Sequence, residues 1–466
     1  MPDHPRAALI LLSAEWFNSV VALPALVEAL KQDRQAILDA LSRELDLSPV
    51  HLVESTGSLQ AACRDLKAAE VDLVILAFQA WAEDFYLIPL LEAVGHTPLS
   101  VWCYQPWLRP PRPAAFVDLL RGSGMVGTFE GLGTIRNIGR PFLFTYGAPA
   151  EPRVVQELAT AARAARVVRA LKSARFGLLP ARNEQMQSTF VDEFRLRADL
   201  GPALDYLSAG MIRRAGEALT EQEVDAFLAD VQARFPVRGV APATLRHAAR
   251  MSLGMARLAA ERSLDVLVMN DISAELHAEL GLRPCLYPDV YERSGIVVGL
   301  EGDVGAGTAL FILDRLTGAP LLFTEFWFWD EPDNVIVGGH AGLQNPAVAE
   351  PGQAWITHDY EYAQTDPTEG AHLQFVARPG RVTLLQLRGT PGGWQAMAAT
   401  GEAIATPPMV EGYPHAVVRL DAGVRDFITT AAKVGSTQHW AMAHGDARAE
   451  LRIVCELLGV PLAVIG

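Results

Sequence analysis

One acid stands inside an otherwise apolar, strand-like stretch and is therefore a candidate for chemistry. The stretch FTEFWFWD, residues 323–330, places Glu325 among aromatic side chains. Burying a carboxylate is costly unless it is paired or bound to a metal ion. The alternation of a strand puts Phe323, Glu325 and Trp327 on one face. An edge strand with Glu325 facing water is an equally good interpretation of this stretch alone.

A second acid follows the segment SGIVVGL and opens a glycine-containing turn. The order strand, glycines, helix over residues 294–307 is that of a dinucleotide site, but the glycines do not follow GxGxxG. Glu301 and Asp303 would also repel a pyrophosphate. Glu301 instead stands at the strand end where open α/β sheets place ligands, and a carboxylate there can bind a divalent metal or move a proton. The alternative is a solvated Glu301 with Asp303 as a helix N-cap.

Histidines supply the remaining candidate groups. His340 lies in GGHAG, whose small side chains leave an imidazole accessible, although a single histidine in a turn is more commonly a surface residue. His439 and His444 are five residues apart, a spacing that does not stack them on one helix face. We therefore expect one ligand at most from that segment.

Two carboxylates and one or two imidazoles form a mixed oxygen and nitrogen donor set. Glu301, Glu325, His340 and His439 would suit Mn²⁺, Mg²⁺ or Co²⁺ better than an ion that prefers thiolates. These residues are far apart in the sequence, so only the fold can bring them together.

The elements that must position these residues change character along the chain. Residues 1–149 and 150–319 both alternate strand and helix patterns, which predicts two tandem doubly wound parallel-sheet domains. Residues 320–466 contain short β-like runs separated by Pro, Gly and Asp, which predicts a β-rich C-terminal domain. On this reading the second α/β domain carries Glu301, and the C-terminal domain carries Glu325, His340 and His439.

Composition excludes several classes of function. The 466 residues carry a formal net charge of −15, which argues against a nucleic-acid surface. Four scattered cysteines form no CxxC pair, so a reduced, cytoplasmic setting is expected. The apolar run near the start is too short for a signal peptide or a membrane span, and no later run is long enough to cross a bilayer.

Five segments resemble the L-fucose/L-arabinose isomerase superfamily, and two of them, AFQAWAEDFYLIPLLEAVGHTPLSVW and GTIRNIGRPF, lie in the N-terminal third. LEGDVGAGTALFILDRLTGAP is similar to the family's acid-bearing segment ahead of a helix. LFTEFWFWDEPDNVIVGGHAG resembles its second acid with the hairpin that follows. QHWAMAHGDARAELRIVCELLGV resembles its closing His-His segment, with Gln438 in place of the first histidine. Ala341 also departs from the family, because the fucose branch usually has a Cys there.

The resemblance implies a site and a reaction. Glu301 and Glu325 would be the metal-binding acid pair and the acid and base, His439 an imidazole ligand, and His340 a ligand as in the arabinose branch. The metal would be Mn²⁺, or another divalent ion such as Mg²⁺ or Co²⁺. The reaction would be aldose–ketose isomerisation of a free monosaccharide through a cis-enediol.

The resemblance further implies a homo-oligomer, a trimer or hexamer, with the active site between subunits. The N-terminal domain of a neighbouring subunit would cover the site, and Gln79, Trp81 and Arg136 are the candidates for that contact. Trp327 and Trp440 would pack on the apolar face of the sugar, or alternatively serve core or interface packing.

Two other functions fit parts of the sequence. A catalytically silent or sensory sugar-binding relative would share the fold, but a pure binder has no need for both Glu301 and Glu325. A nucleotide-dependent oxidoreductase is weakened by the misplaced glycines.

Overall fold

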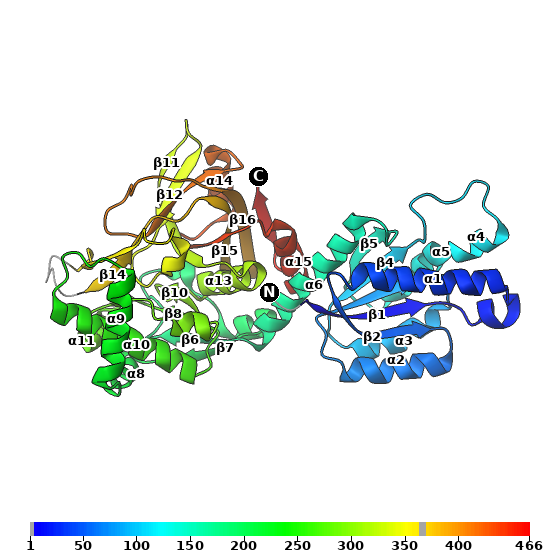
Figure 1. Ribbon diagram of the computed structural model, residues 1–466, viewed down its shortest axis with the longest axis horizontal. Helices are drawn as coiled ribbons and strands as arrows, with labels where there is room; N and C mark the ends of the chain where they lie inside the picture. Colours follow the sequence, from blue (N-terminus) through cyan, green and yellow to red (C-terminus); the bar gives the residue numbers. More distant parts are fainter. Residues whose placement is uncertain (1–3, 363–369) are drawn as a thin grey trace. The chain divides into compact units, whose positions relative to one another are not determined.

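Figure 1 shows the computed structural model of the protein, which describes residues 4–362 and 370–466. The chain divides into two compact units, Met1–Arg169 and Ala170–Gly466. Both contain a parallel sheet, and the second also contains an antiparallel barrel. In the described part of the chain no helix is both long enough and apolar enough to cross a lipid bilayer.

The first unit is a parallel five-stranded sheet in the order β2-β1-β3-β4-β5. Its central strands are almost wholly buried, as expected when helices cover the sheet. Alternate residues of β1 pack into one core cluster with α2 and α3. The strands are β1 (Arg6–Leu12), β2 (Asp46–Val53), β3 (Leu73–Phe78), β4 (Leu99–Tyr104) and β5 (Leu143–Gly147), and the helices are α1 (Pro24–Leu41), α2 (Thr56–Ala68), α3 (Leu87–Val94), α4 (Phe116–Arg121), α5 (Gly124–Asn137) and α6 (Pro152–Ser173).

The parallel sheet of the second unit has the order β10-β8-β6-β7. Leu179, Met269 and Leu300 pair across three neighbouring strands, so the carboxyl ends of these strands are level. The residues that follow them therefore share one edge of the sheet. The strands are β6 (Arg175–Leu179), β7 (Ala203–Tyr206), β8 (Val266–Met269) and β10 (Val297–Leu300), and the helices of this unit are α7 (Glu193–Arg195), α8 (Ala209–Glu217), α9 (Glu221–Arg234), α10 (Pro242–Glu261), α11 (Ala274–Leu280), α12 (Val290–Arg293), α13 (Val304–Thr317), α14 (Val424–Val434) and α15 (Arg448–Leu458).

The predicted β-rich region forms an antiparallel barrel. Its strands follow the order β15-β18-β11-β12-β17-β16, and a direct pairing of β15 with β16 closes the ring. A closed ring leaves none of its six strands as an open edge. The barrel strands are β11 (Leu321–Asp330), β12 (Val335–Gly339), β15 (Gly380–Thr390), β16 (Gly393–Ala403), β17 (His415–Leu420) and β18 (Trp440–His444); β19 (Leu462–Ile465) pairs in parallel with β16, and β9 (Pro284–Cys285), β13 (Trp355–Thr357) and β14 (Ala371–Gln374) form a small separate sheet.

Helix α13 joins the parallel sheet to the barrel. Its residues from Val304 to Leu313 are all buried, because it contacts β10 and β8 as well as β11, β15 and β18 of the barrel. Asp303 caps its first turn by accepting from the Ala306 amide at 2.9 Å, and Gly318 ends it in a left-handed conformation. This packing places the end of β10 beside the strand ends of the barrel.

Candidate metal centre

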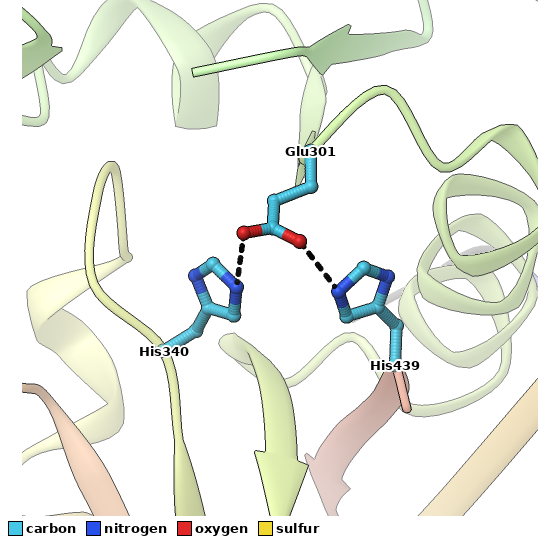
Figure 2. A group of neighbouring side chains, drawn as sticks. All are labelled: Glu301, His340 and His439. Atoms are coloured by element: carbon cyan, nitrogen blue, oxygen red, sulfur yellow. Dashed lines mark hydrogen bonds and ion pairs between the residues drawn. The ribbon is translucent and has the colours of Figure 1, made fainter. Parts of the chain in front are cut away.

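Three of the four predicted donors come together in the second unit. Figure 2 shows the Glu301 carboxylate between the two imidazoles, 3.4 Å from His340 Nε2 and 3.0 Å from His439 Nε2. One donor atom from each residue lies within 4.8 Å of the others, and all three side chains are buried. The alternative of a solvated Glu301 is therefore wrong.

The backbone of Glu301 is held in an unusual conformation. Glu301 directly follows β10 and has φ 53°, in the left-handed region that residues other than glycine rarely adopt. Its amide donates to Asp271 Oδ1 at 3.0 Å, and Asp271 is fully buried. Strain of this kind costs about 1–3 kcal/mol and persists where the surroundings impose it.

Each imidazole is oriented by the ring nitrogen that faces away from Glu301. His340 Nδ1 donates to the Ala341 carbonyl at 2.9 Å, and His439 Nδ1 donates to Asp303 Oδ2 at 2.9 Å. With Nδ1 engaged in this way, Nε2 of each ring faces Glu301 and would bind a metal ion once its own proton has left. Metal-binding histidines are commonly fixed in this way by a carboxylate or a carbonyl, so Asp303 orients a ligand as well as capping α13.

The ionisation of the cluster follows from its geometry. Burial raises the pKa of Glu301, but the hydrogen bonds from His340 and His439 outweigh it, and the pKa lies well below its ordinary value. Burial lowers the pKa of His439, yet Asp303 and Glu301 raise it to about 9. The carboxylate is therefore charged, and a divalent ion would compete with protons for the two Nε2 atoms. Two imidazoles and a carboxylate fit such an ion, of the class that includes Mn²⁺.

Glu325 borders this cluster without belonging to it. Its carboxylate accepts from Trp327 Nε1 at 2.8 Å, so the two side chains are in contact, although the pairing of β11 with β12 shifts register between Phe326 and Phe328 and interrupts the alternation there. Phe323, two residues earlier, lies 4.9 Å from the His340 ring and 4.7 Å from the His439 ring between centroids. Glu325 follows Phe323 by two residues, roughly 7 Å along the strand, and pairs across the hairpin with Gly339, the residue before His340.

The other candidates from the barrel have ordinary packing contacts. Trp440 is buried, and its ring lies 5.9 Å from Phe326 and 5.2 Å from Phe427 between centroids. Trp327 packs edge-on against Tyr413 at 5.4 Å. His444 Nε2 donates to the Arg378 carbonyl at 2.9 Å and is not part of the cluster.

The three candidates from the first unit have partners there. Gln79 is buried and its amide donates to the Leu30 carbonyl. Trp81 is half-buried and donates from Nε1 to Glu130 Oε2 at 2.9 Å. Arg136 is exposed, with its guanidinium 4.7 Å from the centre of the Phe142 ring. Their contact with a neighbouring subunit stays a prediction.

Sequence reasoning missed several polar residues at the same sheet edge. Asn270 follows β8, beside Glu301, and its buried Oδ1 has no hydrogen-bond partner among the described residues. The same is true of Nδ2 of buried Asn183, whose backbone packs against Gly302. The segments LVMND and LLPARN, each a strand followed by polar residues, were the signal available for them.

The chain is similar over most of its length to enzymes named sulfoquinovose isomerase. It is 24% identical to that of Priestia megaterium (strain ATCC 12872 / QMB1551), over 87% of this chain and 88% of the relative. It is 22% identical to that of Alkalicoccus urumqiensis, over 97% of this chain and 98% of the relative. No protein-family model matches the chain. These similarities confirm the prediction of an enzyme of the aldose–ketose isomerase class.

Proposed function

We propose that the protein is a metal-dependent aldose–ketose isomerase of the L-fucose/L-arabinose isomerase superfamily, acting on a free monosaccharide. The observation that carries the proposal is the Glu301 carboxylate between two imidazoles whose Nδ1 protons are already engaged by Ala341 and Asp303. The names of the similar enzymes support the reaction class.

Glu301, His340 and His439 would hold the ion, with Glu325 completing the set. Bound there, a divalent ion polarises a carbonyl oxygen and makes the neighbouring hydroxyl more acidic. The two carboxylates would move the protons: one takes the proton from C2 of the aldose, and the other delivers a proton to C1. Atoms balance when the hydroxyl proton of O2 also passes to O1, because the sugar then loses and gains one carbon-bound and one oxygen-bound hydrogen.

The polar atoms beside Glu301 would position the sugar. Asn183 Nδ2 offers a donor and Asn270 Oδ1 an acceptor, both buried and unpartnered among the described residues. A hydroxyl group can satisfy both kinds of atom. Trp327, with its indole held by Glu325, would present its ring to the apolar face of the sugar. Gln79, Trp81 and Arg136 of a neighbouring subunit would close the site.

A sugar panel tests this proposal. Metal-stripped protein would be incubated with and without Mn²⁺ on sulfoquinovose, the first sugar to try because the similar enzymes carry that name, and on pentoses, hexoses and 6-deoxyhexoses. Ketose formation from one of these sugars only with metal is the expected result. Sugar binding without conversion of any panel member would contradict the proposal and favour a silent sugar-binding relative.

A further inference from the structure

We propose that a buried network centred on Arg283 positions Glu301 and Glu325 relative to one another, so that Asp271, Arg283 and Tyr413 are positioning residues for the reaction. The inference rests on the proposed function for the roles of the two carboxylates. The network itself consists of contacts within the second unit.

The network begins at the backbone of Glu301. Asp271 Oδ1 accepts the Glu301 amide at 3.0 Å, and Asp271 Oδ2 accepts from Arg283 Nη1 at 3.2 Å. The side chains of Asp271 and Arg283 are completely buried. The hydrogen bond to Asp271 holds the left-handed backbone at Glu301, and that backbone sets the direction of the Glu301 carboxylate.

Arg283 connects Asp271 to two acids that follow strand β13 of the small sheet. Its Nε and Nη2 donate to the two oxygens of Asp359 at 2.9 and 2.7 Å, and its Nη1 also donates to Glu361 Oε2 at 2.5 Å. One planar guanidinium thus spans three carboxylates, which the point charge of a lysine cannot do.

The other end reaches Glu325. Tyr413 donates its hydroxyl hydrogen to Glu361 Oε1 at 2.9 Å, and its ring packs against Trp327 at 5.4 Å. Trp327 Nε1 then donates to Glu325 Oε1 at 2.8 Å. An unbroken series of contacts therefore runs from the amide of Glu301 to the carboxylate of Glu325.

Stability alone does not explain this arrangement. Burying charged groups costs several kcal/mol per ion, and well-packed apolar side chains of similar volume are often as stabilising or more so. The network also joins three carboxylates, those of Asp271, Asp359 and Glu361, to one guanidinium, so its negative charges outnumber its positive charges. A role in orienting the two reacting carboxylates accounts for the presence of charged groups that are costly to bury.

Conservative variants test the inference. Asp271→Asn keeps the shape of the side chain and removes its charge, and Tyr413→Phe keeps the ring and removes the hydroxyl. Outer-sphere changes of this kind typically cost 10–100-fold in metal affinity or activity. We expect each variant to lose about 10-fold or more in kcat with KM little changed, and Asp271→Asn also to weaken Mn²⁺ binding by about 10-fold. The double variant should lose less than the product of the two single losses, because both changes act on one network.

The control is Arg381→Met, which breaks a half-buried pair with Asp421 and Asp446 in the same unit. It should lower thermal stability while leaving kcat and the Kd for Mn²⁺ unchanged. Wild-type kcat and Kd in both Asp271→Asn and Tyr413→Phe would overturn the inference, as would equal losses in Arg381→Met. A wild-type protein that binds Mn²⁺ but converts no sugar would contradict the proposed function, and the Mn²⁺ affinity of Asp271→Asn would still test the network.

Discussion

Glu301 is placed by its backbone as much as by its side chain. Its left-handed φ, its bond to Asp271 and its two imidazole partners all act on one residue. The sequence predicted Glu301 as a site residue from its place at the end of a strand. It predicted His340 and His439 from the short segments around them. It gave no signal for the pairing of Arg283 with Asp359, because 76 positions separate them.

Replacing Glu301 with glutamine removes the charge and nearly preserves the volume. We expect Glu301→Gln to lose Mn²⁺ affinity and to lower kcat by about 10²–10⁴-fold, the usual contribution of a positioned acid or base. Turnover assays and calorimetric Mn²⁺ titration measure both effects. The exposed Glu275→Gln is the control, and a Glu301→Gln protein with full activity would contradict the assignment.

A buried histidine outside the metal centre predicts a pH effect on stability. Burial lowers the pKa of His372 to about 4, and neither ring nitrogen has a partner among the described residues. The unfolded chain, with an ordinary pKa near 6.5, binds the proton more tightly, so this group destabilises the fold as the pH falls from about 6.5 toward about 4. The full effect is on the order of 3 kcal/mol.

His372→Leu should remove this dependence. We expect the variant to be as stable as the wild type at pH 7.5 and to lose less stability on going to pH 4.5, because no buried imidazole must be protonated. Urea unfolding of both proteins at the two pH values measures the difference. Equal losses of stability in both proteins would show that His372 does not titrate in this way.

At the scale of elements, the strand and helix patterns predicted most of what positions the site. The wholly apolar runs became parallel strands, and the Pro- and Gly-separated runs became the barrel, since each pattern reflects how many faces of a strand are buried. The closure of β15 on β16 had no local signal, because register between distant strands depends on tertiary packing. The doubly wound description and the boundaries of the three predicted domains stay predictions.

The hairpin of β11 and β12 requires a residue without a side chain, Gly339, directly before His340. A Cβ on Gly339 would lie 2.0 Å from the Pro414 carbonyl oxygen, against strand β17. Gly339→Ala should therefore lower stability by about 1–3 kcal/mol, as overpacking does, and weaken Mn²⁺ binding by moving His340. Gly392→Ala, in open space in the same unit, is the control for thermal unfolding and metal titration. Unchanged values for Gly339→Ala would contradict the prediction.

At the scale of the whole molecule, the metal should stabilise the fold. The donors lie directly after β10, directly after β12 and directly before β18, which belong to the parallel sheet and the barrel of one unit, so an ion would connect the sheet to the barrel. Mn²⁺ at 100 times its Kd should add about 2.7 kcal/mol to the free energy of unfolding. A melting temperature of the metal-stripped protein that Mn²⁺ does not raise would contradict this. The trimer or hexamer with shared active sites stays a prediction.

The most direct test of the central claim is isomerisation in D₂O. Metal-stripped protein, restored with Mn²⁺, would be given the aldose that the sugar panel identifies, and the product would be examined by NMR. Proton transfer between carboxylates and sugar predicts ketose formed only with the ion and carrying deuterium at C1, because a carboxyl proton exchanges with solvent. Ketose formed equally without the ion, or ketose free of deuterium, would contradict the account.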